Sequence, residues 1–108
     1  MHKAGKVFLN KIYTGVLSFE EGRYVFVYDK QYLIRRDAKK IGIHFPLRAE
    51  PFYSPILFSL FFAMLSEGVL KEIQCQTLRI DETDYFKRLL KTSAVDTIGA
   101  LMIEEIIS

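Results

Sequence analysis

The sequence has a single cysteine, Cys75, and no tryptophan among its 108 residues. One cysteine excludes an internal disulfide and a cysteine-based zinc site, and it favours a reducing compartment, so we expect a cytoplasmic protein. The opening MHKAGKVFLNKIYTG carries charges and turn residues where a secretory signal would have an apolar run. The longest apolar stretch, residues 55–66, is roughly half of the ~20 residues that a transmembrane helix needs. A membrane span is therefore not expected.

Motifs for common catalytic chemistry are also missing. The sequence contains no glycine-rich phosphate loop, no serine in a nucleophile-elbow setting and no pair of histidines at metal-ligand spacing. His2 and His44 are isolated, and we expect both to be structural or surface residues. Lys71 and Arg79 lie four positions to either side of Cys75 and would favour its thiolate, but no base is nearby in sequence. We predict a protein that is not an enzyme and that uses no cofactor or metal.

Short apolar runs in the first half predict β-strands. The first three runs are KVFLN, IYTGVLSF and RYVFVY, and turn residues separate them. A polar connection follows, and then IGIHFPL predicts a fourth strand with Ile41, Ile43 and Phe45 pointing inward. Residues 97–103 predict a final short strand near the end of the chain.

The second half predicts three helices, at residues 55–66, 69–78 and 82–91. Ser54 and Asp81 stand where the first and the last of these helices would need an N-cap, and Gly68 would end the first. We therefore expect residues 1–108 to form a single α+β domain. In this domain a small antiparallel sheet of four to five strands packs with about three helices.

Positive charge is concentrated in the first half. Residues 1–50 hold ten Lys or Arg against five Asp or Glu, whereas residues 51–108 hold five against eight. A basic cluster in the polar connection could contact the phosphates of a nucleic acid, and it consists of Arg35, Arg36, Lys39 and Lys40. No aromatic platform or recognition helix accompanies this cluster, so a solvated loop is the competing interpretation.

Four segments in order resemble the N-terminal subdomain of HipA-type serine/threonine kinase toxins. They are VFLNKIYTGVL, YVFVYDKQYL, IHFPLRAEPFYSPILFSLFFAMLSEG and DTIGALMI, and the resemblance extends from about residue 6 to residue 103. In that family the catalytic body of the kinase follows the segment similar to DTIGALMI. Here the chain ends soon after that segment, so it resembles the stand-alone HipS-type version of the subdomain.

The resemblance implies the function of an antitoxin. Proteins of the HipS type bind and neutralise HipT kinase toxins in tripartite type II toxin–antitoxin systems, with HipB as the DNA-binding partner, so no direct DNA binding by this chain is expected. The implied partner-binding residues lie on the apolar helix and the corner after it: Phe58, Phe61, Phe62, Leu65, Ser66, Glu67, Gly68, Val69 and Leu70. The sequence leaves open whether this helix is interface or central core. The alternative function is a nucleic-acid-binding or repressor-complex accessory protein that uses residues 35–40.

Overall fold

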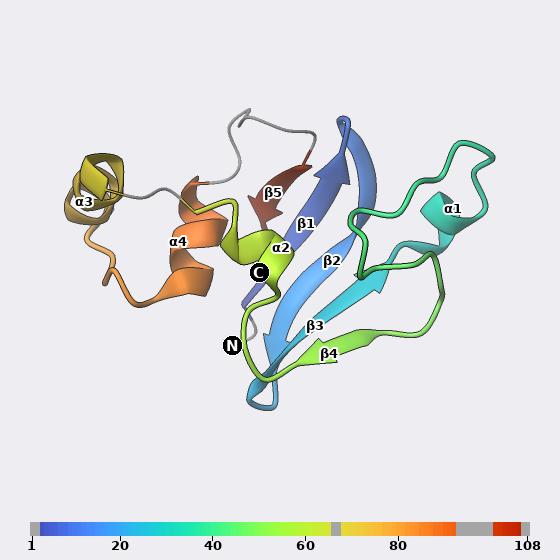
Figure 1. The fold of residues 1–108 in the computed structure, drawn as a ribbon, viewed down its shortest axis with the longest axis horizontal. Helices are drawn as coiled ribbons and strands as arrows, with labels where there is room; N and C mark the ends of the chain where they lie inside the picture. Colours follow the sequence, from blue (N-terminus) through green and yellow to red (C-terminus); the bar gives the residue numbers. More distant parts are fainter. Residues whose placement is uncertain (1–2, 66–67, 93–100, 107–108) are drawn as a thin grey trace.

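A computed structural model describes residues 3–65, 68–92 and 101–106, and Figure 1 shows its fold. The strands are β1 (Lys3–Leu9), β2 (Ile12–Glu20), β3 (Arg23–Tyr28), β4 (Phe52–Ser54) and β5 (Leu101–Glu105). The helices are α1 (Lys30–Leu33), α2 (Ser59–Phe62), α3 (Gly68–Leu78) and α4 (Tyr85–Thr92). The strands form one antiparallel sheet in the order β4-β3-β2-β1-β5. The predicted α+β class is confirmed.

Two tight turns build the centre of the sheet. The β1–β2 turn has Asn10 at φ 52° and Lys11 at φ 68°, and the β2–β3 turn has Glu21 at φ 53° and Gly22 at φ 78°. Consecutive positive φ angles belong to the two-residue turns whose twist matches that of the flanking strands. Both turns lie where the sequence predicts them.

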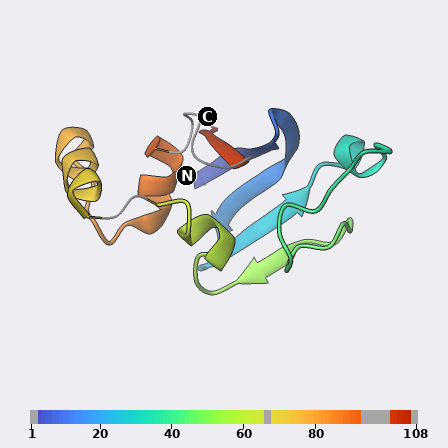
Figure 2. The same cartoon turned by 45° about the horizontal axis from the view of Figure 1, so that its top comes forward.

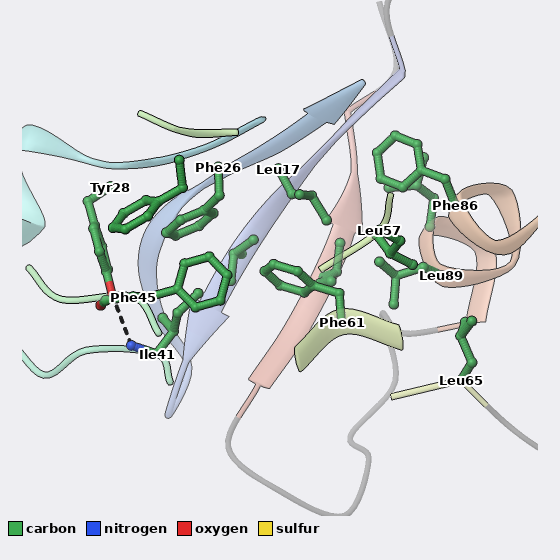
Figure 3. Packing of buried hydrophobic residues seen from close by; sticks show 14 of the residues in the cluster. Leu17, Phe26, Tyr28, Ile41, Phe45, Leu57, Phe61, Leu65, Phe86 and Leu89 are labelled. Carbon is green, nitrogen blue, oxygen red and sulfur yellow. Dashed lines mark hydrogen bonds between the residues drawn. The ribbon is translucent and has the colours of Figure 1, made fainter. Parts of the chain in front are cut away.

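One face of the sheet carries the hydrophobic core. Helices α2 and α4 lie on this face (Figures 1 and 2), and Phe61 of α2 reaches between the sheet residues and Leu89 of α4 (Figure 3). Leu17, Phe26 and Phe61 have no exposed surface. The apolar face of α4, which the sequence predicts from its helical spacing, is buried as expected and consists of Phe86, Leu89 and Leu90.

The predicted fourth strand in IGIHFPL is wrong. This segment is irregular, and the fourth strand is β4, which is only three residues long. Ile41 and Phe45 are buried as predicted, but Ile43 is 79% exposed. The physical reason is the Tyr28 hydroxyl, which accepts the Ile41 N–H at 3.0 Å and donates to the Phe45 carbonyl, so this tyrosine occupies backbone groups that a strand ladder would use.

Two helix predictions need correction at their starts. The apolar helix predicted from residue 55 begins only at Ser59, because Phe58 has an extended backbone (φ −55°, ψ 138°) and Ser54 belongs to β4. Helix α4 begins at Tyr85 rather than residue 82. The carboxylate that accepts an N–H of its first turn, from Lys87 at 3.2 Å, is that of Asp84.

The remaining elements agree with the sequence to different extents. Helix α3 has nearly the predicted bounds. Strand β5 is described from Leu101 onward, and the predicted strand residues 97–100 lie outside the described part of the chain. The short helix α1 was not predicted, and the Asp29 carboxylate caps it by accepting the Tyr32 N–H at 3.2 Å.

Candidate partner-binding surface

Helices α2 and α4 present an exposed aromatic pair. The rings of Phe62 and Tyr85 meet edge to face with their centroids 5.1 Å apart, and the two residues remain 42% and 39% exposed. They border a hollow of about 550 Å³, which we call the aromatic hollow. Its lining is completed by Tyr24, Pro55, Ile56, Leu57, Ser59 and Ala63. A surface of this composition favours apolar contact with another protein.

Phe61, the residue before Phe62, anchors α2 and thereby the aromatic pair in the core. Phe61 is fully buried, with its ring centroid 6.1 Å from that of Phe26 and 6.0 Å from that of Phe45. Leu65, one turn further along the chain, is 7% exposed. The core therefore holds α2 in place while Phe62 faces outward.

Helix α3 exposes a second apolar group. Figures 1 and 2 show α3 at the end of the molecule, beyond α4 and away from the sheet. Leu70, Ile73 and Leu78 are 54%, 54% and 44% exposed; Leu70 and Ile73, three positions apart, share one side of the helix, and Leu78 lies nearer the side of Cys75. Cys75 is 6% exposed, and Lys71 Nζ lies 4.0 Å from the Glu82 carboxylate. We call Leu70, Ile73 and Leu78 the α3 face.

The structure separates the predicted partner-binding residues into three groups. Phe61 and Leu65 belong to the core, so their prediction as contact residues needs correction. Both side chains pack in the core and hold α2 on the sheet. Phe62 and Leu70 are exposed, and Phe58 is half-buried against Phe45. The remaining four lie at the corner: Ser66 and Glu67 are outside the described residues, and of Gly68 and Val69 only the backbone, in the first turn of α3, is described.

Four exposed apolar residues of these two groups were not among the predicted contacts. Ile56 (71% exposed) and Tyr85 line the aromatic hollow, and Ile73 and Leu78 belong to the α3 face. The spacing of Leu70 and Ile73 by three positions was a signal for the second group. Nothing in the sequence places Ile56 beside Tyr85, since the sheet brings their segments together.

The four residues of the basic cluster are exposed in the loop that follows α1. Arg35 forms a two-point ion pair with Asp37, with Nε–Oδ1 at 3.0 Å and Nη2–Oδ2 at 3.1 Å. The hydrogen bond from Arg35 lowers the pKa of the Asp37 carboxyl. Arg36, Lys39 and Lys40 are solvated, and the Tyr32 hydroxyl fixes the backbone of Lys39 by accepting its N–H at 2.9 Å and donating to its carbonyl at 2.7 Å. The cluster thus stands on an ordered loop with part of its charge compensated.

Two other kinds of site are absent from the described residues. Residues 3–65, 68–92 and 101–106 contain no group of three or more His, Cys, Asp or Glu side chains placed to hold a metal ion. Within the same ranges, no helix has both the length and the apolar character required to cross a membrane.

Comparison with known proteins identifies the family. The family model of the HipA N-terminal domain matches residues 5–104. The chain belongs to the HipA N-terminal domain family. A curated relative, an uncharacterized protein of Haemophilus influenzae, is 33% identical over 103 residues, which are 95% of this chain and 92% of the relative. A solved structure, the N-terminal domain of HipA toxin, is 29% identical with a TM-score of 0.73, and the match covers 97% of this chain and 93% of that chain. The HipA N-terminal domain fold therefore extends over nearly all of the sequence, as its motifs predict.

Proposed function

We propose that this HipA N-terminal domain protein is an antitoxin that binds a HipT-like serine/threonine kinase toxin and neutralises it by protein–protein contact. In this proposal it acts in the cytoplasm as the HipS-type member of a tripartite HipB–HipS–HipT system, and a HipB-like DNA-binding protein completes the complex. It has no catalytic activity of its own. Membership of the HipA N-terminal domain family supports the toxin–antitoxin context.

The observation that carries the proposal is the exposed aromatic pair of Phe62 and Tyr85 beside the aromatic hollow. Clustered apolar side chains on a small monomer commonly mark interaction sites. Aromatic side chains that enter a partner's pocket often carry much of the binding energy. Because Phe61 fixes α2 to the core, the pair is held in place before binding, which lowers the entropy lost on association.

The α3 face supports a contact larger than the aromatic pair alone. A stable interface usually buries about 800 Å² on each partner. Phe62 and Tyr85 are too few to supply such an area. Among the described side chains, α2, α3, α4 and the segment before α2 together offer six large apolar ones above one-third exposure: Ile56, Phe62, Leu70, Ile73, Leu78 and Tyr85. We assign this region to the kinase.

Co-expression with the HipT-like kinase of the same operon tests the proposal. Wild-type protein is expected to restore growth and to co-purify with the kinase, whereas Phe62→Asp is expected to lose both, because it places a charge in the aromatic hollow. Ile34→Asp is the matched control: Ile34 is 76% exposed and follows α1, far from α2 and α4 in Figure 1. Circular dichroism must show that both variants are folded.

Each result has a defined meaning. Failure of the wild type to rescue growth and to co-purify contradicts the antitoxin function. Rescue by the wild type and equally by Phe62→Asp supports the function and contradicts the assignment of the aromatic hollow to the kinase. Loss of rescue in Ile34→Asp as well would locate the contact elsewhere on the molecule.

A further inference from the structure

Strand β4 forms an open edge of the sheet. It is the last strand on its side, and Figures 1 and 2 show no described element outside it. The N–H of Asp29 at the end of β3 donates to the Thr14 carbonyl of the β2 side at 2.8 Å. Bonding in an antiparallel ladder alternates, so Val25, four residues earlier, also directs its N–H and C=O toward β2. Its partner on β4 is Tyr53, whose N–H and C=O therefore point away from the sheet.

A second hollow adjoins this edge. Its volume is about 640 Å³, and its walls include Phe45, Phe52 and Leu60, with Ile43 and Ile56 at the mouth. Ile43 is 79% and Ile56 is 71% exposed. We call it the β4 hollow. Phe52 belongs to the core face of the sheet, so a strand added beside β4 would direct every second side chain into the β4 hollow.

An arginine stands on each face of β4. The Arg48 guanidinium lies 3.9 Å from the ring centroid of Phe52, and it is held there because Nε donates to the Glu50 carbonyl at 3.3 Å and Nη2 to the Pro51 carbonyl at 3.0 Å. This arrangement leaves the N–H groups of Nη1 for a carboxylate. On the opposite face the Arg23 guanidinium lies 4.0 Å from the ring centroid of Tyr53. Both charges are positioned before any partner arrives.

We propose that the β4 edge and the β4 hollow form a further docking site, which binds an extended segment of a partner protein in which apolar residues alternate with Asp or Glu. The segment adds to β4 as a strand through the outward N–H and C=O of Tyr53. Its apolar side chains enter the β4 hollow, and its carboxylates on the other face meet Arg23. Arg48, at the rim of the hollow, adds positive charge that attracts the acidic segment.

Charge selects this occupant over a second copy of the chain. The connection between α1 and β4 carries five Lys or Arg, namely Arg35, Arg36, Lys39, Lys40 and Arg48, against Asp37 and Glu50. A second copy would bring more of the same positive charge to this edge, whereas an acidic segment complements the charge already there. The site adjoins the aromatic hollow, because Ile56, Leu57 and Ser59 line both. It does not depend on the proposed antitoxin function.

Fluorescence anisotropy of the full chain with a labelled octapeptide of alternating valine and aspartate tests the proposal. We expect saturable binding that weakens by at least about tenfold in Arg48→Glu and in Tyr53→Pro. A proline at an outward-facing edge position leaves the ladder to β3 intact, so Tyr53→Pro removes the exposed N–H together with the ring that lies under Arg23. Lys11→Glu, an equal charge reversal on the exposed β1–β2 turn, is the matched control and should bind as the wild type does.

Two comparison ligands separate strand addition from simple charge attraction. A valine–lysine octapeptide and a peptide with the same valines and aspartates in two blocks should bind at least about tenfold more weakly than the alternating acidic peptide. Equal binding of either peptide, unchanged binding in Arg48→Glu, tighter binding of a single-stranded oligonucleotide, or no saturable binding at all would each overturn the proposal. If Tyr53→Pro fails to fold by circular dichroism, Arg48→Glu and the two comparison peptides decide the outcome.

Discussion

The connection between α1 and β4 and the helix α3 contrast in how they are attached to the rest of the molecule. The connection, residues 34–51, has no regular structure, yet two of its residues, Ile41 and Phe45, are buried in the core. Helix α3 is eleven residues long, yet Cys75 is the single buried side chain among those described on it. In this protein, buried side chains and their hydrogen bonds attach a segment to the rest of the molecule, and regular secondary structure by itself does not.

The difference has a clear origin in the aromatic core. Phe45 of the connection has ring centroids of four other phenylalanines within 6.0 Å, those of Phe26, Phe52, Phe58 and Phe61. The Tyr28 and Tyr32 hydroxyls add hydrogen bonds to the backbone of the connection. Helix α3 receives no comparable aromatic contact among its described side chains. An irregular segment with such anchors can present Arg48 and the β4 hollow in one geometry, whereas α3 offers an apolar face.

The largest expected effect comes from removing the anchor of the connection. Phe45→Ala should lower the free energy of unfolding by about 3–5 kcal/mol, because it removes a buried ring and leaves a cavity among the surrounding phenylalanines. Urea unfolding followed by circular dichroism measures this change. Leu47→Ala, at a residue of the same segment that is 42% exposed, is the control and should cost much less. A loss below about 1 kcal/mol for Phe45→Ala would contradict the anchoring role.

A second prediction concerns the tyrosine that replaces a strand ladder. Tyr28→Phe should lower the free energy of unfolding by about 1–3 kcal/mol, since the Ile41 N–H and the Phe45 carbonyl lose their buried partner while the ring remains. Urea unfolding gives the magnitude, and faster amide exchange at Ile41 gives the location. Tyr24→Phe is the matched control, because no hydrogen bond of the Tyr24 hydroxyl occurs within the described residues. Equal losses in the two variants would show that the bonds to the connection contribute little.

The hydrogen bonds of the Tyr28 hydroxyl also explain why the backbone of the connection could not be predicted from the sequence. The first three strands and their turns could be predicted because alternation and turn residues act locally. Ile41 and Phe45 show the spacing of a strand and are buried. The Tyr28 hydroxyl, however, is thirteen residues from Ile41 and seventeen from Phe45 in the sequence, and it forms hydrogen bonds with their backbone groups. Burial was predictable there, and backbone conformation was not.

The candidate partner-binding surface could likewise be predicted only in part. The composition of residues 55–66 predicts an apolar segment without deciding between core and interface, and Phe62 was among the predicted contacts. The choice between Phe61 and Phe62 as core residue depends on where the sheet lies relative to α2, which helical spacing alone does not decide. The β4 hollow depends on three segments brought together only in the folded chain, so the sequence offered no signal for it.

A third prediction uses the ionisation of three tyrosines that are buried to different extents. Burial raises the pKa of Tyr28 above its ordinary value of 10.0, and it does the same for Tyr24 and Tyr13. The neutral form is thus favoured in the folded state, and above about pH 10 the unfolded chain holds fewer protons than the native protein. This contribution is complete below the ordinary pKa, and stability falls as pH rises beyond it. The midpoint of urea unfolding should therefore decrease between about pH 9 and pH 11, less steeply in Tyr28→Phe.

The result is informative in either direction. A decrease that is equally steep in Tyr28→Phe would assign alkaline destabilisation to tyrosines other than the one that holds the connection. A midpoint that does not change over this range in the wild type would show that the hydroxyls titrate alike in the folded and unfolded states. Far-UV circular dichroism at each pH ensures that only folded protein is compared.

The smallest effect is expected on the α3 face. Ile73→Ala should change the free energy of unfolding by no more than about 0.5 kcal/mol, because the side chain is already 54% exposed and alanine favours the helix. Urea unfolding checks this value, with Ile80→Ala as the buried counterpart: Ile80 is 6% exposed and should cost clearly more. A large loss in Ile73→Ala would mean that the α3 face is covered within the protein itself. A negligible loss would show that Ile73 has no role in folding. Its exposed apolar side chain would then be available for contact with a partner.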